Sequence, residues 1–240
     1  TLTVDDLQAG KTYFYRIKVK DGDTYEDSAI FTFKTAQLPR TITIDGVSNT
    51  RDLGGYLTTD GKYRVRQSMV YRGANLEGIT TQGKQEFLDK YGIKTDLDIR
   101  GDRKRSPLGN SVNYVTVVGP QYIQIADEQY QNALAKEIRT FADPSNYPVY
   151  FHCQIGRDRT GTLAMLINAL LGVSEEDIYM DYELSMFSQA GWADNTPVDD
   201  LVNRHFYEAV EYIKGYQSGT LQENAAAFVK NELDITQAEI

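Results

Sequence analysis

One segment constrains the fold of this chain more than any other, because it joins a strand-type run directly to a helix-type run. The apolar, β-prone residues YPVYFH (147–152) lead through CQIGRDRT (153–160) into GTLAMLINALLG (161–172), which has the composition of a buried helix. A turn between a strand and a helix faces the helix N-terminus, where unpaired N–H groups and the positive end of the helix dipole converge. Such a turn binds a phosphate oxyanion, so we expect an anion site here.

The rest of the chain after about residue 37 alternates strand-type with helix-type segments. Strands are expected at 41–45, 68–73, 94–100, 112–118 and 147–152, and helices at 80–92, 126–143, 161–172 and 174–187, followed by a helical tail. We expect the first helix to close at Gly92, the second to end before Pro144, and Ser174 to cap the start of the last. Interleaved strands and helices predict an α/β domain over 37–240, with a central sheet flanked by helices.

Residues 1–36 have a different pattern. YFYRIKVK (13–20) and AIFTFKT (29–35) alternate apolar with polar side chains, as half-buried strands do. The segment LQAGKTYFYRI resembles the end of a fibronectin type III domain, where Leu7, Gly10 and Tyr13 would mark the tyrosine corner. This resemblance predicts a partial β-sandwich over 1–36, and the alternative is a hairpin attached to the main domain.

The composition excludes several classes of partner and cofactor. The chain has 240 residues, a formal net charge of −9 and one cysteine. The negative charge argues against general affinity for nucleic acid or an anionic membrane, and no apolar run reaches the roughly 18 residues that a membrane span needs. One cysteine excludes an internal disulfide, and with two histidines it makes no plausible metal site, so we expect neither a metal nor another cofactor.

The single cysteine, Cys153, has cationic neighbours, unlike a structural cysteine, which prefers apolar ones. The helix dipole and the nearby arginines favour its thiolate, which is the nucleophilic form. Arg159 follows after five intervening residues, and in a tightly curled loop this spacing turns a fork of donors toward the thiolate to hold two phosphate oxygens. Gly156 permits the sharp backbone path, and the Thr160 hydroxyl is placed to bond the thiolate. The loop therefore combines a nucleophile with an anion cradle.

HCQIGRDRTG (152–161) resembles the phosphate-binding loop HCxxGxxRTG of the protein tyrosine phosphatase superfamily. More narrowly, it is similar to the loop HCxxGKDRTG of bacterial tyrosine phosphatases. NTRDLGGY (49–56) is similar to that family's NFRDLGG motif, LDIR (97–100) to its DLR, and VYRGANL (70–76) to its FRSGxL strand. The resemblance covers roughly residues 40–240 and implies a tyrosine-phosphatase-like α/β fold.

Three positions depart from the family pattern. Arg157 stands where the family usually has lysine, Thr50 where it has phenylalanine, and Gly73 where it has serine. None of these changes removes a catalytic group. Exchanging lysine for arginine keeps the positive charge but changes its reach, which bears on substrate preference.

The resemblance implies a phosphoester hydrolysis in two steps. Cys153 attacks phosphorus and forms a cysteinyl-phosphate, which water then hydrolyses, while one carboxyl group acts first as acid and then as base. Asp158 is the expected acid, although a carboxylate near a helix N-terminus is also favoured on electrostatic grounds alone. Asp127 is the alternative acid, and its other expected role is to cap its helix. The full set of site residues is Cys153, Arg159 and Asp158 for catalysis, Gln154, Ile155, Gly156, Arg157 and Thr160 for phosphate binding, and His152, Asn49, Arg51, Asp52 and Arg100 for support.

These residues predict a metal-independent phosphatase acting on phosphotyrosine, with phosphoserine, phosphothreonine and phosphoinositides as further substrates. Two alternatives remain open: a phytase-like enzyme acting on inositol phosphates, which would need a strongly basic pocket, and a catalytically silent module that only binds phosphorylated ligands. Thiol redox chemistry usually needs a second, resolving cysteine, and the chain has none.

Some assignments have two interpretations. Arg157 either contacts a second phosphate or a lipid, or is a solvated charge at the rim of the loop. The basic run RGDRKR (100–105) either recruits an anionic substrate or is simply solvated. Trp192, in a predicted loop, is a candidate for the mouth of the site. The fibronectin-like segment favours a secreted or surface-attached bacterial enzyme, with a cytoplasmic location as the alternative.

Overall fold

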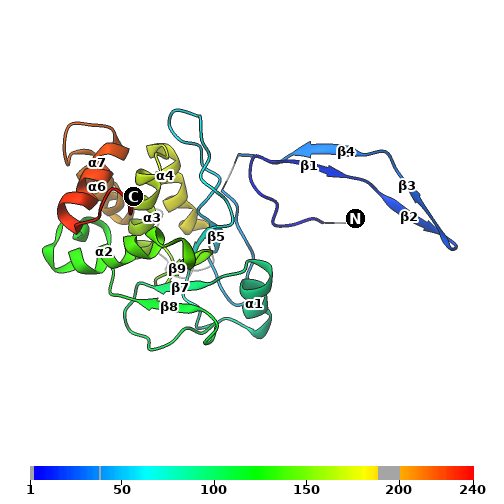
Figure 1. Ribbon diagram of the computed structural model, residues 1–240, viewed down its shortest axis with the longest axis horizontal. Helices are drawn as coiled ribbons and strands as arrows, with labels where there is room; N and C mark the ends of the chain where they lie inside the picture. Colours follow the sequence, from blue (N-terminus) through cyan, green and yellow to red (C-terminus); the bar gives the residue numbers. More distant parts are fainter. Residues whose placement is uncertain (1–2, 38, 189–200) are drawn as a thin grey trace.

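The computed structural model describes residues 3–37, 39–188 and 201–240, and a five-stranded sheet lies at its centre (Figure 1). Its strands are ordered β5 (Arg51–Asp52), β6 (Val70–Gly73), β9 (Val149–His152), β7 (Thr95–Asp98) and β8 (Asn113–Thr116). The last four are parallel, and β5 is antiparallel to β6. A mostly parallel sheet flanked by helices confirms the predicted α/β class.

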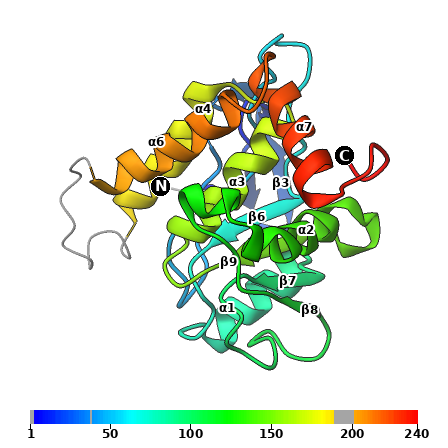
Figure 2. The ribbon, with the colours of Figure 1, turned by 90° about the vertical axis from the view of Figure 1, so that its left-hand side faces the viewer.

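Helices cover both faces of this sheet (Figure 2). On one face α3 (Asp158–Leu170) packs against α4 (Glu175–Glu183), α6 (Leu201–Lys214) and α7 (Leu221–Leu233), and α2 (Glu128–Ala142) packs against α7. The other face carries α1 (Thr81–Gln85) and the π-helical turn Glu86–Lys90 that continues it. Short 3-10 turns lie at Tyr122–Ala126, Pro144–Asn146 and Leu184–Phe187. No helix among the described residues combines the length and the apolar character that crossing a membrane requires.

The central strand β9 shows how the two faces are filled. Val149 and Phe151 belong to the larger core, which lies under α3, whereas Tyr150 belongs to a second core with Tyr71 and Phe87. Side chains of a strand alternate between its two faces, so one apolar strand supplies both cores. This places Cys153, the next residue but one after Phe151, at the centre of the sheet's edge.

The predicted helix ends agree with the structure. Gly92 has a left-handed φ of 66° just after the first helical segment, and α2 ends at Ala142, before Asp143 and Pro144. The Ser174 hydroxyl accepts a hydrogen bond from the backbone N–H of Asp177, which is the predicted N-cap of α4.

The strand predicted at 41–45 is wrong. Only a single bridge joins Thr41 to Arg51, and Ile44 pairs with Val47 instead of with a neighbouring strand. The chain turns back on itself between Ile44 and Val47, so it cannot continue along the sheet. The edge of the sheet at this side is therefore the short β5.

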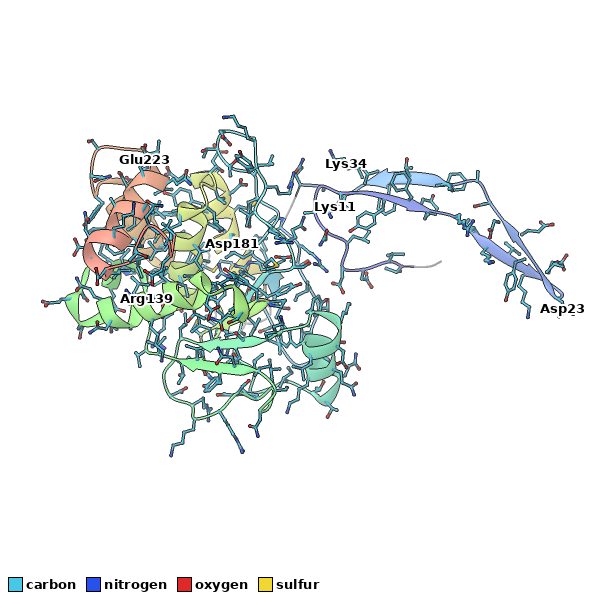
Figure 3. The ribbon with its side chains drawn as sticks, in the orientation of Figure 1. Lys11, Asp23, Lys34, Arg139, Asp181 and Glu223 are labelled. Carbon is cyan, nitrogen blue, oxygen red and sulfur yellow. The ribbon has the colours of Figure 1, made fainter. Side chains whose placement is uncertain are left out.

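The N-terminal residues form an arm that projects away from the α/β domain (Figure 1). Strands β1 (Thr12–Tyr15) and β4 (Phe31–Lys34) pair near its base, and β2 (Lys18–Asp21) and β3 (Thr24–Asp27) pair near its tip. Figure 3 shows Lys11 and Lys34 at the base and Asp23 at the tip. Both pairs are antiparallel and two-stranded among the described residues, so the arm has the form of a long hairpin.

One face of this arm is aromatic. Tyr13 stacks on Phe33 and Tyr15 stacks on Phe31, with ring centroids 5.7 and 5.4 Å apart. The backbone N–H of Gln8 also donates to the Tyr13 hydroxyl at 2.8 Å, a bond from tyrosine to upstream backbone like the one in a tyrosine corner. These contacts fit either expectation for residues 1–36, a sandwich fragment or a hairpin.

Candidate active site

The predicted phosphate-binding loop, residues 153–157, leaves the carboxyl end of β9 and enters α3. β9 lies between β6 and β7, so the loop stands at the middle of the sheet edge where the parallel strands end. This is where ligands bind in open parallel α/β sheets. Cys153 directly follows β9, is a free thiol and is 3% exposed.

Side chains from outside this loop hold its carbonyl groups, whereas most of its N–H groups have no partner among the described residues. Three successive carbonyl oxygens accept hydrogen bonds from side chains outside the loop: Gln154 from Asn75 Nδ2 (2.8 Å), Ile155 from Asn49 Nδ2 (3.0 Å) and Gly156 from Arg72 Nη2 (2.8 Å). The N–H groups of residues 154–156 and 158–160 donate no hydrogen bond to any described residue. A curled backbone with its amides left open is an anion cradle.

Gly156 is required for this curl. Its φ is +76°, in the left-handed region that favours glycine, and a Cβ there would clash with the backbone of Gly73. The loop therefore packs directly on the end of β6. This agrees with the role predicted for Gly156 from the sequence.

Arg159, in the first turn of α3, is half-buried and forms no hydrogen bond or ion pair with any described residue. The positive charge of Arg159 acts on Glu137 of α2, a residue that the sequence did not point to. Burial raises the pKa of Glu137 to about 8, and the charge of Arg159 opposes this rise. Glu137 Oε1 is buried without a hydrogen-bond partner. The guanidinium has no partner among the described residues and is thus left to an incoming anion, while the buried carboxyl near it is favoured in its neutral form.

Asp158 lies at the N-terminus of α3 and is a quarter exposed. Its Oδ1 accepts hydrogen bonds from the Tyr122 hydroxyl and from Arg157 Nε, the latter at 3.0 Å. The Tyr122 hydroxyl in turn lies 2.8 Å from that of Tyr182. Asp127, the alternative acid, is exposed at the start of α2 and makes no capping hydrogen bond with its side chain.

For two predicted phosphate-binding side chains, one of the expected arrangements is not found. Arg157 is only 6% exposed and points to Asp158 and to the Met186 sulfur, so it is not the solvated rim charge that one interpretation expected. The Thr160 hydroxyl is buried and has no hydrogen-bond partner, so the bond expected from it to Cys153 is absent. Arg157 and Thr160 are both buried because the start of α3 lies inside the domain.

Beneath the loop lies a buried cluster of charges that the sequence analysis identified only in part. Arg51 Nε donates to Asp181 Oδ1 at 2.8 Å, and Arg72 Nη1 donates to Asp181 Oδ2. Burial alone would raise the pKa of Asp181, but the two guanidinium groups outweigh it and lower the pKa. Figure 3 shows Asp181 in the interior of the α/β domain. Because Arg72 also holds the Gly156 carbonyl, this cluster fixes the loop to α4.

His152 and Arg100 contact the loop from β9 and the end of β7. His152 Nδ1 lies 3.1 Å from the Cys153 carbonyl and Nε2 lies 3.1 Å from Asp96 Oδ1. Burial lowers the pKa of His152, but the hydrogen bond and charge of Asp96 outweigh it and raise the pKa. Arg100 Nη1 donates to Gln154 Oε1 at 3.2 Å.

Of the predicted supporting residues, Arg51 reaches the loop only through Asn49 and Asp181, and Asp52 does not contact it. Its carboxylate accepts hydrogen bonds from the backbone N–H groups of Gly54 and Ser68, at 2.8 and 2.7 Å. It therefore fixes the turn after β5. Trp192 lies outside the described residues.

A sequence profile described as the tyrosine phosphatase family matches residues 42–240, so the chain belongs to this family. A protein of Cupriavidus necator named "Putative tyrosine-protein phosphatase" is 29% identical over 171 residues, which cover 59% of this chain. The chain matches 61% of that protein's length.

Two solved structures are also similar. The core catalytic domain of the PP-IP phosphatase SIW14 from S. cerevisiae is 16% identical with a TM-score of 0.46, and the match covers 80% of this chain and 97% of that one. TpbA from P. aeruginosa is 18% identical with a TM-score of 0.43, over 69% of this chain and 89% of that one.

Proposed function

We propose that this chain is a phosphatase that hydrolyses phosphate monoesters through a cysteinyl-phosphate on Cys153. One observation carries the proposal: the loop that begins with Cys153, the only thiol in the sequence, leaves the N–H groups of residues 154–156 and 158–160 and the Arg159 guanidinium without a partner among the described residues. Donors fixed in this way stabilise the equatorial oxygens of a transferring phosphoryl group without further reorganisation. Membership of the tyrosine phosphatase family supports the same reaction.

In the first step the Cys153 sulfur attacks phosphorus, and the bond from phosphorus to the ester oxygen breaks. Asp158 gives a proton to the departing oxygen. In the second step Asp158 takes a proton from water, the water oxygen attacks phosphorus, and the sulfur leaves as thiolate with inorganic phosphate as product. Arg159 and the loop amides hold the phosphoryl oxygens in both steps.

The proposed substrates are phosphotyrosine esters, with phosphoserine, phosphothreonine and phosphoinositide monoesters as further candidates. Family membership supports phosphotyrosine. A phytase-like activity on inositol phosphates remains the second candidate, because a basic pocket is lined by Arg100, which is hydrogen-bonded to Gln154 of the loop. A silent binding module is disfavoured, since Cys153, Arg159 and Asp158 are all present.

Turnover of 4-nitrophenyl phosphate tests this proposal. The wild type should release phosphate with or without a chelator, and Cys153→Ser should reduce kcat to the background of the assay. Activity that survives Cys153→Ser, or that a chelator abolishes, would contradict the mechanism.

To assign the acid, the pH dependence of kcat/KM is compared for Asp158→Asn and the matched variant Asp127→Asn. Only the former should remove the limb that depends on the protonated acid.

For residues 1–36 we propose the end of a fibronectin-type domain and, with it, an exported or surface-attached bacterial enzyme. The bond between Gln8 and Tyr13 and the aromatic face of the arm support the first part. Immunoblots of cells and culture fluid of the source organism test the second part. Finding the protein only inside cells would contradict export.

A further inference from the structure

Beside the phosphate-binding loop lies a pocket of about 680 Å³ that its chemistry does not use. Eight residues line it, four of them cationic and two acidic: Arg100, Arg103, Lys104, Arg105, Glu77, Asp102, Ser106 and Pro107. We propose that this pocket is a subsite for a second phosphate on the substrate whose first phosphate occupies the Cys153 loop. This inference rests on the proposed function and selects, among its substrates, small molecules that carry two or more phosphates, such as phosphorylated cyclitols.

The topology places the pocket next to the loop. β7 and β9 are parallel neighbours, with Asp98 paired to His152, so the segments that follow them leave the same edge of the sheet side by side. Arg100 and Gln154 stand two residues beyond this pair, and their side chains are hydrogen-bonded at 3.2 Å. A molecule with one phosphate in the loop can therefore extend over Gln154 into the pocket.

The basic segment is held in place at both ends. At its start, Gly101 has a left-handed φ of +76° and packs against Val118, which turns the chain sharply after Arg100. At its end, the buried Ser106 hydroxyl donates to Asp96, and the other oxygen of this carboxylate contacts His152. The Asp96 carboxylate thus links the basic segment to β9, the strand that precedes Cys153. The relative positions of the two segments are therefore fixed before a substrate binds.

The charges in this pocket are only partly neutralised. Arg100 and Arg103 both pair with Glu77, whereas the side chains of Lys104 and Arg105 are exposed and form no hydrogen bond or ion pair with a described residue. Lys104 and Arg105 therefore form a local site for anions. The chain as a whole has a net charge of −9 and would otherwise repel them. A substrate with one phosphate would fill the loop and leave these cations without a partner.

The test compares Lys104→Ala/Arg105→Ala with the control Lys11→Ala/Lys20→Ala, which removes two exposed lysines from the arm. Phosphate release is measured from 4-nitrophenyl phosphate, inositol hexakisphosphate, inositol 1,4,5-trisphosphate, vesicles of phosphatidylinositol 4,5-bisphosphate, and a doubly phosphorylated peptide. We expect the double variant to lower kcat/KM for both free inositol phosphates and for the vesicles by about 10-fold or more, mainly through KM. Turnover of 4-nitrophenyl phosphate should stay within about twofold, and the control should change nothing.

Equal losses for every substrate, or a loss for the vesicles alone, would overturn the subsite, because the first indicates a general effect and the second a membrane contact. A loss confined to the doubly phosphorylated peptide would also overturn it. If the wild type hydrolyses none of the esters, the proposed function fails instead. The subsite is then judged by calorimetric binding of inositol hexakisphosphate to Cys153→Ser, which Lys104→Ala/Arg105→Ala must weaken by about 10-fold or the inference fails.

Discussion

Glu137 is a buried carboxyl group that is costly to bury, and it lies close enough to Arg159 of the site for the two charges to interact. It lies between Leu134 and Ile138 on the buried face of α2, and one of its oxygens has no hydrogen-bond partner. An unpaired buried carboxyl is favoured in its neutral form, which explains why its pKa is raised to about 8. A substrate phosphate on Arg159 would reduce the positive charge that Glu137 feels.

Glu137→Gln should therefore change how stability depends on pH. Between the ordinary glutamate pKa of 4.5 and the native pKa of about 8, the folded protein holds a proton that the unfolded chain releases. The free energy of unfolding of the wild type should fall as pH rises through this window, by at most about 5 kcal/mol from this group. Glutamine cannot ionise, so the variant should lose this part of the slope.

Urea unfolding at pH 5 and pH 8 measures the effect, with Glu128→Gln as an exposed control on the same helix. If Glu137→Gln and the wild type show the same difference between the two pH values, Glu137 does not titrate as its surroundings indicate.

At the scale of elements, the loop is held by α4 as well as by the strands beside it. Asp181 of α4 binds Arg51 of β5 and Arg72 of β6, and all three side chains are almost completely buried. Removing one partner of such a cluster leaves a charge without compensation in the interior. The position of α4 and the shape of the loop should therefore depend on each other.

Asp181→Asn should lower the free energy of unfolding by about 3–5 kcal/mol at neutral pH, and it should reduce kcat with it. The arginines depress the pKa of Asp181, so its stabilisation is present above the unfolded pKa of 3.8 and is lost as pH falls below it. The penalty of the variant should accordingly shrink in acid. Chemical denaturation at pH 7 and pH 3 checks this, with Asp177→Asn one turn earlier as control; equal penalties at both pH values would contradict the assignment.

The elements also show how far sequence reasoning extends. The segment 147–172 was predictable because a β-prone run, a turn and an apolar helix follow one another without a gap. The segment 41–45 has the composition of a strand, but its pairing depends on the turn between Ile44 and Val47, which composition does not specify.

Among the site residues, the loop and its Asn49 contact could be expected from motifs, whereas Glu137 and Asp181 could not. Both carboxylates stand three residues after a core residue, Leu134 and Ile178, on the buried face of a helix. A carboxylate at a core position indicates a cation near it, as Arg51 and Arg72 are for Asp181. The cation itself comes from the packing of distant elements, which no local pattern reveals.

In the whole molecule, the arm docks near one end of the parallel strands and the site lies at the other end. Ala9 exchanges two hydrogen bonds with Gln67, which precedes β6, whereas Cys153 lies beyond the other end of the paired strands β6 and β9. The aromatic pairs of the arm add nothing to either core of the α/β domain. Catalysis should therefore not depend on the arm.

Deleting Thr12–Lys34 tests this independence. Lys11 and Thr35 are hydrogen-bonded at 2.9 Å, so an Asn-Gly turn can join them without disturbing the docked residues before them. We expect kcat/KM for 4-nitrophenyl phosphate and the melting temperature to stay close to those of the full chain. A deletion variant that no longer folds, or that folds without activity, would make the arm part of the catalytic unit.

The most direct test of the account is to trap the covalent intermediate. The wild type is mixed with 4-nitrophenyl phosphate, quenched within milliseconds in acid, and analysed by mass spectrometry of the intact chain and its peptides. We predict one added phosphoryl group on the peptide containing Cys153, formed at least as fast as turnover and missing from Cys153→Ser. A phosphoryl group on any other residue, or turnover with no phosphorylated chain at any quench time, would contradict the central claim.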